Sequence, residues 1–349
     1  MEETSNLSWD SVITAAQAYR ASDILLAQNA IYFKRGSESV DKRYTLTPQC
    51  FKALGDQVKT EELLVDKDFT YNGRAGASDF SWEYAGSRFR VNKYKTYQGD
   101  SFAIRPLAAK IPTMEMVGFS REVIRILDTK RQGLVIVTGP TGSGKSTALA
   151  AMLEYLNQHY PLNIISIEDP IEYVYNSKKS IIQQREVGRD VGEFSTAVRS
   201  AMRESPDAIL VGEIRDYATL KACLQASETG HLVFATLHTK GVASTLLRML
   251  DMAPSSDRSE IASMLALAYQ MVIYQKLIFC KNKYVTVREI LLPHVGVRNC
   301  LRTGSIAEVN NSIQMSRSQG MISWEGDIQL KLQAGEITPD VAKILKEQI

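Results

Sequence analysis

A glycine-rich stretch, residues 139–147, constrains the fold of this chain more than any other part of its sequence. It reads Gly-Pro-Thr-Gly-Ser-Gly-Lys-Ser-Thr, follows the apolar run 134–137 and precedes the Ala- and Leu-rich residues 148–156. A strand, a tight glycine turn and a helix in this order direct backbone N–H groups at a phosphate. A glycine-rich hairpin turn is the alternative, but the helical run that follows argues against it. The sequence therefore predicts a phosphate-binding loop.

Each residue type in this stretch has a chemical role in such a loop. Lys145 would neutralise charge on the β- and γ-phosphates of a triphosphate, and Ser146 would supply a hydroxyl ligand to Mg²⁺. The glycines would let the backbone bend tightly and approach the ligand. We therefore expect ATP and Mg²⁺ as ligands, with the nucleotide held by Gly139, Pro140, Thr141, Gly142, Ser143, Gly144, Lys145, Ser146 and Thr147.

The composition favours a globular protein of the reducing cytoplasm with about two domains. The 349 residues exceed one ordinary core, and 41 basic against 39 acidic side chains give no charge that would attract nucleic acid or an anionic membrane. The 4 cysteines are scattered, so neither a zinc site nor a disulfide framework is predicted. The acidic N-terminus precedes no apolar stretch, and the most apolar window, 261–279, contains polar residues in a helical alternation. We expect neither a secretory signal nor a membrane span.

The pattern of the chain predicts two domains that meet near residue 112. Residues 9–107 are mixed α/β, with a helix expected at 11–20, short strands at 24–26 and 31–34, and a hairpin of strands 79–84 and 88–94. Pro106 and Pro112 suggest a hinge, and a helix is expected at 119–127. Strands and helices then alternate as in a parallel sheet, with strands at 134–138, 164–168, 208–211 and 232–237, and a helix-rich tail begins at about residue 251.

Acidic or polar side chains follow three of these parallel strands, where ligands bind in an open α/β sheet. Glu213 is the best candidate for the carboxylate that positions an attacking water. Gly212 stands where a magnesium-associated aspartate is common, so Glu213 could touch Mg²⁺ directly or through water. Glu168 could polarise the water or hold the hydration shell of the metal, and His238 could bond the γ-phosphate alongside Thr236. Singly, such residues could be a helix cap or a core histidine, but their joint occurrence indicates a site.

The succession of motifs resembles the secretion-ATPase superfamily of type II and type IV secretion, and within it the PilT-type pilus retraction ATPases. The acidic stretch 167–172 and the histidine-containing stretch 228–234 are specific to this superfamily, whereas the phosphate loop is shared by many NTPases. The other stretches that carry the resemblance are 21–23, 88–92, 184–187 and 211–216.

The resemblance implies a PAS-like α+β domain with its hinge in residues 1–112, joined to a RecA-like P-loop ATPase domain in residues 113–349 that ends in the helical region. It also implies a homohexamer in which nucleotide lies between the two domains and hydrolysis drives their rotation. In the family, arginines of the N-terminal domain reach the phosphates, and the matching positions are Arg88, Arg90 and Arg105. Surface ion pairing is the alternative role for these arginines. Gln98 stands where a further arginine is common.

Retraction and assembly ATPases of pili share these motifs but differ elsewhere. Assembly and type II secretion members usually carry a four-cysteine zinc insert and a longer N-terminal extension, which this sequence lacks. Residues 296–303 resemble a retraction-type motif, with Thr303 in place of its usual glutamate, although a plain helix N-terminus would also explain them. The resemblance thus implies a motor for type IV pilus retraction on the cytoplasmic side of the inner membrane. An inner-membrane platform protein is its expected partner, with neither zinc nor nucleic acid.

Other functions stay open on the sequence alone. A pilus-assembly, type II or conjugation-type secretion ATPase would show the same motifs. A nucleic-acid translocase would use the same engine but would need basic loops with interleaved aromatics, which the near-neutral charge does not favour. A GTPase switch would need an Asn-Lys-x-Asp motif to recognise guanine. The sequence does not supply it, because Asn282-Lys283 is followed by Tyr284-Val285. A non-hydrolysing adaptor conflicts with the presence of Glu213.

Overall fold

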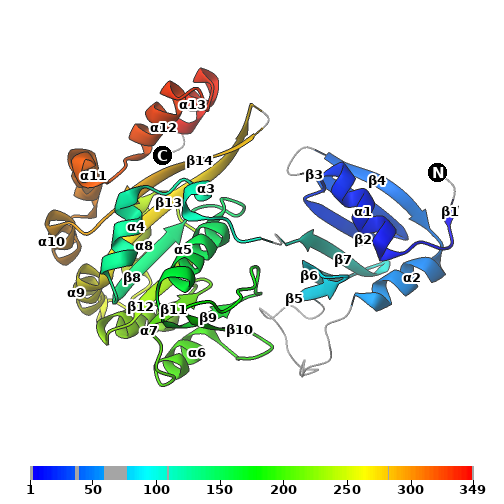
Figure 1. Ribbon diagram of the computed structural model, residues 1–349, viewed down its shortest axis with the longest axis horizontal. Coiled ribbons are helices and arrows are strands. Elements are labelled where there is room, and N and C mark those ends of the chain that lie inside the picture. Colours follow the sequence, from blue (N-terminus) through cyan, green and yellow to red (C-terminus); the bar gives the residue numbers. More distant parts are fainter. Residues whose placement is uncertain (1–2, 36–38, 59–76, 108–109, 282, 348–349) are drawn as a thin grey trace. The chain divides into compact units, whose positions relative to one another are not determined.

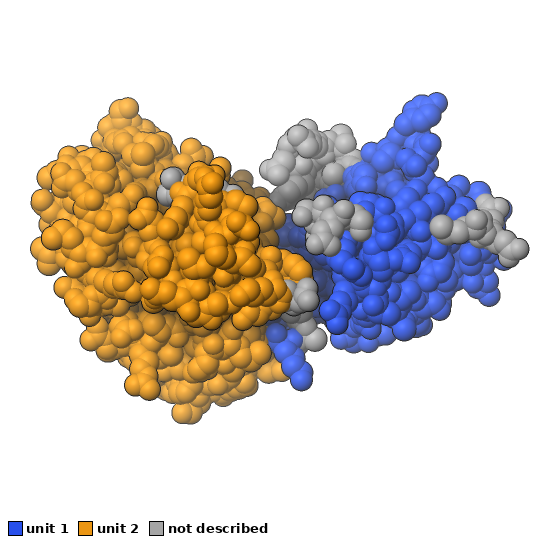
Figure 2. Space-filling model, turned by 90° about the horizontal axis from the view of Figure 1, so that it is seen from above, with its two compact units in different colours: residues 1–110, 169–174, 188–190 blue, residues 111–168, 175–187, 191–349 orange. Residues whose placement is uncertain are grey.

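Residues 3–35, 39–58, 77–107, 110–281 and 283–347 are described by the computed structural model of this chain. The chain divides into two units (Figure 2). Unit 1 (blue) comprises residues 1–110, 169–174 and 188–190, and unit 2 (orange) comprises residues 111–168, 175–187 and 191–349. The sequence places the boundary near residue 112 and does not anticipate the two short segments counted with unit 1. That the two units are separately folding domains stays a prediction.

Unit 1 is built on an almost entirely antiparallel sheet (Figure 1). Within the described residues its seven strands follow the order β1-β4-β3-β2-β7-β6-β5, and β1 and β4 form the parallel pair. Helices α1 (Trp9–Tyr19) and α2 (Pro48–Gln57) contribute buried residues to its core. The strands are β1 Glu3–Thr4, β2 Asp23–Ala27, β3 Ala30–Arg35, β4 Ser39–Leu46, β5 Ala77–Tyr84, β6 Ser87–Thr96 and β7 Gly99–Pro106.

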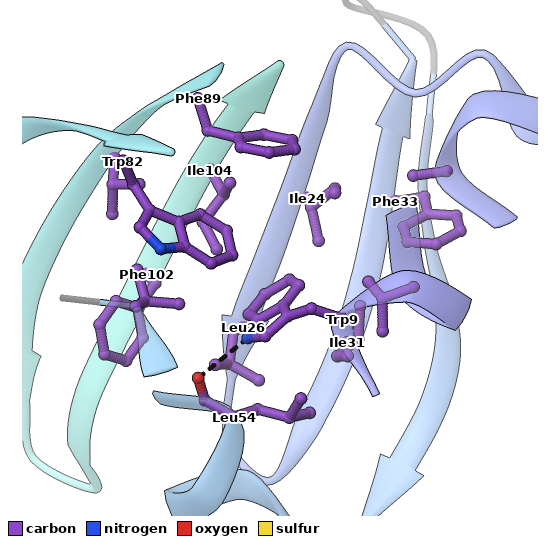
Figure 3. Packing of buried hydrophobic residues seen from close by; sticks show 14 of the residues in the cluster. Trp9, Ile24, Leu26, Ile31, Phe33, Leu54, Trp82, Phe89, Phe102 and Ile104 are labelled. Atoms are coloured by element: carbon purple, nitrogen blue, oxygen red, sulfur yellow. Dashed lines mark hydrogen bonds between the residues drawn. The ribbon is translucent and has the colours of Figure 1, made fainter. Parts of the chain in front are cut away.

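Aromatic and aliphatic side chains together fill the core of unit 1 (Figure 3). Trp9 is fully buried, its ring centroid lies 5.1 Å from that of Trp82, and its Nε1 donates a hydrogen bond to the backbone oxygen of Leu54 at 3.0 Å. Along β6, the buried Phe89 and Val91 alternate with more exposed residues, because successive side chains of a strand point to opposite faces. The predicted first helix, the two short strands and the hairpin are confirmed.

Unit 2 contains a mainly parallel sheet. Within the described residues its seven strands follow the order β10-β9-β11-β12-β8-β13-β14, and β13 and β14 form the antiparallel pair at one edge. Strands β8, β11 and β12 are buried along their whole length, as in parallel sheets covered on both faces. The strands are β8 Gly133–Thr138, β9 Asn163–Glu168, β10 Ile181–Glu186, β11 Ala208–Val211, β12 Leu232–Leu237, β13 Tyr269–Cys280 and β14 Lys283–Leu291. The four predicted parallel strands are therefore confirmed.

Helices connect these strands and continue beyond β14. Within the described ranges, every helix is too short or too polar to cross a membrane. The α-helices are α3 Met114–Val117, α4 Arg121–Thr129, α5 Lys145–His159, α6 Phe194–Ala201, α7 Tyr217–Glu228, α8 Val242–Asp251, α9 Arg258–Ala268, α10 Val295–Thr303, α11 Val309–Met315, α12 Trp324–Gln333 and α13 Pro339–Lys346. Short 3₁₀ helices lie at Ile306–Glu308 and Arg317–Gln319. The four cysteines, Cys50, Cys223, Cys280 and Cys300, are buried and free.

The prediction of a helix-rich tail from about residue 251 is wrong for residues 269–291. These residues form β13 and β14, which pair with each other, and β13 also pairs with β8. Residues 269–275 of β13 are buried on both faces of the strand, and a buried strand and a buried helix cannot be distinguished by an apolar run alone. Gln270 and Gln275 suggested the polar face of a helix, but both side chains are buried. Pairing with the neighbouring strand β8 favours a strand rather than a helix for the first of these segments, β13.

Candidate active site

Residues 139–144 form the loop between β8 and α5, and α5 begins at Lys145 with Gly144 as its N-cap. Gly142 and Gly144 have φ angles of +77° and +84°, which favour glycine. A Cβ atom at Gly139 would lie 2.2 Å from the backbone oxygen of Gln275, so only glycine fits there. The first N–H groups of α5 lack partners within the helix and lie beside this glycine turn. The loop therefore fits the phosphates of a nucleotide.

Lys145 is buried at the start of α5, with 8% of its surface exposed. Its Nζ donates to the backbone oxygens of Gly139 at 3.0 Å and Pro140 at 3.1 Å, and lies 3.5 Å from Nδ1 of His238. The ammonium group is thus already removed from water and held over the loop. Because Coulomb attraction is stronger where water is excluded, a phosphate in the loop would interact strongly with it.

His238 links Lys145 to the acidic side of the site. Its Nε2 lies 3.3 Å from Oε2 of Glu213, while its Nδ1 faces the lysine. An ammonium group can only donate, so Nδ1 accepts and the proton belongs on Nε2, which donates to the carboxylate. Desolvation, and then the charges of Lys145 and Arg215, lower the pKa of His238, which favours this neutral form. Arg215 Nε donates to the other oxygen of Glu213.

Glu168 lies at the end of β9, next to the strand that leads to Glu213. Its Oε1 accepts hydrogen bonds from Ser166 Oγ at 2.8 Å and from Gln184 Nε2 at 3.1 Å. A Cβ atom at Gly212 would come within 3.3 Å of the Glu168 Cα, so the two strand ends approach closely. This contact gives a physical reason for glycine where the sequence led us to look for aspartate. Thr236 donates its hydroxyl hydrogen to the Gly212 backbone oxygen at 2.5 Å, and its contact with a γ-phosphate stays a prediction.

The three predicted phosphate-binding arginines belong to unit 1, on β6 and β7. Arg90 and Arg105 are direct partners across the two strands. Arg105 Nη2 lies 2.9 Å from Oδ1 of Asp23, and Arg90 Nη1 lies 3.6 Å from Oε1 of Glu172 within the same unit. Arg88 Nη1 is buried and has no hydrogen-bond partner among the described residues. The ion pairs with Asp23 and Glu172 offset the like charges of Arg105 and Arg90, whereas the unpartnered buried donor of Arg88 is destabilising.

The donor set for a metal ion is small. The predicted donors are the hydroxyl group of Ser146, in the first turn of α5, and the carboxylate of Glu213, which follows β11. Their role in metal binding stays a prediction. Nowhere in the described ranges do three or more His, Cys, Asp or Glu side chains gather to hold a metal by themselves. This donor set fits Mg²⁺, which is usually bound by one or two protein oxygens together with substrate phosphates and water.

Sequence reasoning missed two buried polar residues behind the phosphate loop. Gln275 Nε2 donates to the backbone oxygen of Ser143 at 2.8 Å, and Arg288 Nε donates to Gln275 Oε1 at 3.3 Å. The available signal was a pair of polar residues inside two apolar strands. It was lost because β13 was taken for a helix.

The arrangement defines a class of protein. A parallel sheet whose first strand leads through a glycine loop into a helix, with carboxylates at neighbouring strand ends, is the site of a P-loop nucleotide-binding protein. Comparison with known proteins then gives the family. Residues 80–334 match the model of the Type II/IV secretion system protein family, so the chain belongs to this family and is an ATPase of it.

Relatives and solved structures agree with this assignment. The chain is 47% identical over 246 residues to the type IV pilus retraction ATPase PilT of Pseudomonas aeruginosa, covering 70% of this chain and 71% of the relative. It is 42% identical over 268 residues to a twitching motility protein of Neisseria gonorrhoeae, covering 76% and 71%. The crystal structure of the pilus retraction motor PilT with bound ADP superposes with a TM-score of 0.84 at 35% identity, covering 97% of each chain. The predicted family and the two-part α/β fold class are confirmed.

Proposed function

We propose that this chain is the ATP-hydrolysing subunit of a homohexameric motor that powers type IV pilus retraction. It acts from the cytoplasmic side of the inner membrane, in contact with an inner-membrane platform protein. The observation that carries the proposal is the continuous contact from the phosphate loop through Lys145 and His238 to Glu213. The similarity to a solved retraction motor over 97% of the chain supports the direction of the work.

The contacts suggest how the site performs hydrolysis. The loop N–H groups and Lys145 bind the phosphates, and Glu213 orients the attacking water in line with the leaving group. Ser146 and Glu213 would hold Mg²⁺, which supplies positive charge to the β- and γ-phosphate oxygens when bound. Because the proton of His238 lies on Nε2, this histidine can donate to a γ-phosphate oxygen in place of Glu213. Glu213 would then be released toward the water.

The family resemblance implies further phosphate contacts from the arginines of unit 1. Arg88, Arg90 and Arg105 concentrate positive charge on β6 and β7, with two of them directly opposite each other. A phosphate would add negative charge beside Arg90 and Arg105 and provide an acceptor for Arg88 Nη1. We propose that these side chains contact nucleotide when the motor closes, as the family resemblance implies.

Hydrolysis by the full chain tests the proposed enzyme. We expect turnover that rises as hexamers form, measured as phosphate release across a range of protein concentrations with mass photometry alongside. Lys145→Ala and Glu213→Gln should each lower the rate by at least about 100-fold, the loss typical of a transition-state contact. Lys179→Ala, which removes an exposed lysine of unit 2, is the matched control and should stay within about twofold of wild type. Equal rates in all variants would contradict the proposed site.

Direction of work needs a cellular test. Cells lacking this chain should keep surface pili but lose pilus retraction, followed by labelled pili under the microscope. Loss of surface pili would instead favour an assembly ATPase, which is the second candidate because assembly and retraction members share these motifs. Complementation with Glu213→Gln separates motor activity from the mere presence of the protein.

A further inference from the structure

A buried polar path crosses unit 2 behind the phosphate loop. It begins at the backbone oxygen of Ser143, which accepts from Nε2 of Gln275 at 2.8 Å, and Gln275 is 1% exposed. The Oε1 atom of the same amide accepts from Nε of Arg288 at 3.3 Å, and the two residues are direct partners in the β13–β14 pairing. Reversing the amide would set nitrogen against the guanidinium donors and oxygen against the carbonyl. The path therefore fixes one orientation of Gln275.

Arg288 carries the path onward to α3. Its Nη2 donates to the backbone oxygen of Val117 at 2.7 Å, and its Nη1 donates to that of Gly118 at 3.2 Å. The guanidinium carbon lies 4.5 Å from the ring centroid of Phe119. Carbonyl groups at a helix C-terminus lack partners within the helix, so Arg288 closes the end of α3. These elements all belong to unit 2 and can be followed in Figure 1.

The burial of Arg288 indicates more than packing. The side chain is 6% exposed, and desolvation lowers its pKa to about 10. A hydrophobic side chain of similar size in such a place is often neutral or stabilising. A guanidinium group, however, can hold three acceptors in a fixed arrangement, and here all three of its nitrogens are directed at acceptors. The backbone N–H of Arg288 also donates a hydrogen bond, to Oδ2 of Asp327 on α12 at 2.7 Å.

We propose that Gln275 and Arg288 are positioning residues that couple the phosphate loop to residues 111–118, the segment that follows unit 1 along the chain. Phosphate binding draws on the N–H groups of the loop, and the Ser143 carbonyl belongs to the peptide group whose N–H is that of Gly144. A rotation of this peptide group changes its bond to Gln275, and Arg288 passes the change to the end of α3. Such coupling is reciprocal, so the position of the segment also alters nucleotide affinity. The inference rests on the proposed nucleotide site.

The test compares three variants of the full chain with wild type. Gln275→Met breaks both contacts of the amide at similar volume. Gln275→Glu keeps an acceptor for Arg288 but sets an oxygen against the Ser143 carbonyl. Gln270→Met is the matched control, because Gln270 is also buried on β13 but packs beside Gly133, at the start of β8. The measurements are the Kd of fluorescent ADP with Mg²⁺ and hydrogen–deuterium exchange of a peptide covering residues 111–119, with and without ADP.

We expect ADP to slow exchange in this peptide in wild type and in Gln270→Met. Gln275→Met should raise the Kd about tenfold, the factor that loss of the hydrogen bond to the Ser143 backbone oxygen is worth, and should abolish the response to ADP. Gln275→Glu should keep the exchange seen without nucleotide, because Arg288 retains its partner, yet lose the response. Should Gln275→Met fail to fold, as judged by circular dichroism, Gln275→Glu decides.

Three results would overturn the coupling. If wild type binds and hydrolyses nucleotide and both Gln275 variants show the wild-type Kd and exchange response, the coupling alone is wrong. If wild type itself binds no ADP, the proposed nucleotide site fails and the coupling fails with it. A loss of response in Gln270→Met equal to that in Gln275→Met would also contradict the proposal, because it would assign the effect to packing of β13.

Discussion

The sheets of unit 1 and unit 2 both bury hydrophobic side chains, but they place their polar side chains differently. In unit 1, antiparallel strands alternate buried and exposed side chains, so charges such as Arg88 and Arg90 lie along one face of a strand. In unit 2, the parallel strands β8, β11 and β12 are buried throughout, so polar groups gather where strands end. Lys145, Glu213 and His238 all follow such strand ends. Parallel strands that are buried along their whole length therefore leave polar groups at their ends, whereas a half-exposed sheet can carry charge along its face.

The largest effect that we predict comes from replacing one buried tryptophan in each unit. Trp9 in unit 1 and Trp324 in unit 2 are both buried, and each donates its Nε1 to a leucine backbone oxygen at 3.0 Å. Replacing either residue by alanine should lower the stability of its own unit by about 3–5 kcal/mol, because a large cavity forms. Calorimetry should show Trp9→Ala lowering one melting transition and Trp324→Ala lowering the other. A single transition shifted equally by both would show that the two cores unfold together.

We expect a smaller loss of stability from removing a helix cap in each unit. Thr47 caps α2 in unit 1 by accepting from the Cys50 N–H at 3.2 Å, and Thr338 caps α13 in unit 2 by accepting from the Val341 N–H at 3.4 Å. Each Thr→Ala change should cost about 1 kcal/mol, since one terminal N–H group loses its partner. Chemical denaturation followed by tryptophan fluorescence should report the losses. Equal losses would show that local helix chemistry is the same in both units, and a clearly larger loss in one would contradict that.

The smallest predicted effect is a change in melting temperature with pH. It should be confined to unit 2, because that unit contains the histidines. All 4 histidines of the sequence lie in the part of the chain assigned to unit 2. Because the pKa of His238 is lowered in the folded chain, the unfolded chain binds more protons below about pH 6.5, and stability falls as pH falls through this range. The half-exposed side chain limits the effect to a shift on the order of one degree in Tm between pH 7.5 and 5.5.

The control for this pH effect is His238→Gln. Its unit 2 transition should lose part of the shift between the two pH values, and the unit 1 transition should be the same in both proteins. Melting curves by circular dichroism provide the comparison. A shift of the same size in wild type and His238→Gln would mean that this histidine does not contribute.

The parts of the fold that the sequence predicts are those set by local pattern. The glycine loop and the four parallel strands around it follow from glycine spacing and short β-branched runs, and each was found where predicted. The β13–β14 hairpin could not be predicted in this way, because its side chains are buried by contacts with β8 and with helices distant in the sequence. Edge strand β10 was missed for the opposite reason, since residues such as Gln183 interrupt its apolar run.

The candidate site shows the same division. Lys145 and Glu213 belong to local motifs and could be named from the sequence. The bond from His238 to both of them depends on the order of β8, β11 and β12 in the sheet, which spacing alone does not give. Gln275 and Arg288 were missed because residues 269–280 were taken for a helix, and the role of a polar residue in an apolar run depends on partners that are distant in the sequence. The phosphate-contacting role of Arg88, Arg90 and Arg105 stays a prediction.

The burial of all four cysteines has a consequence for chemical labelling. Each cysteine residue is at most 6% exposed, and burial raises the pKa of the Cys223 thiol to about 12, so little reactive thiolate forms there at neutral pH. Maleimide dyes and spin labels should therefore react with an introduced surface cysteine before they react with the native ones. A probe pair, with one label on each unit, can be installed in the otherwise native chain to follow the motor through its nucleotide cycle.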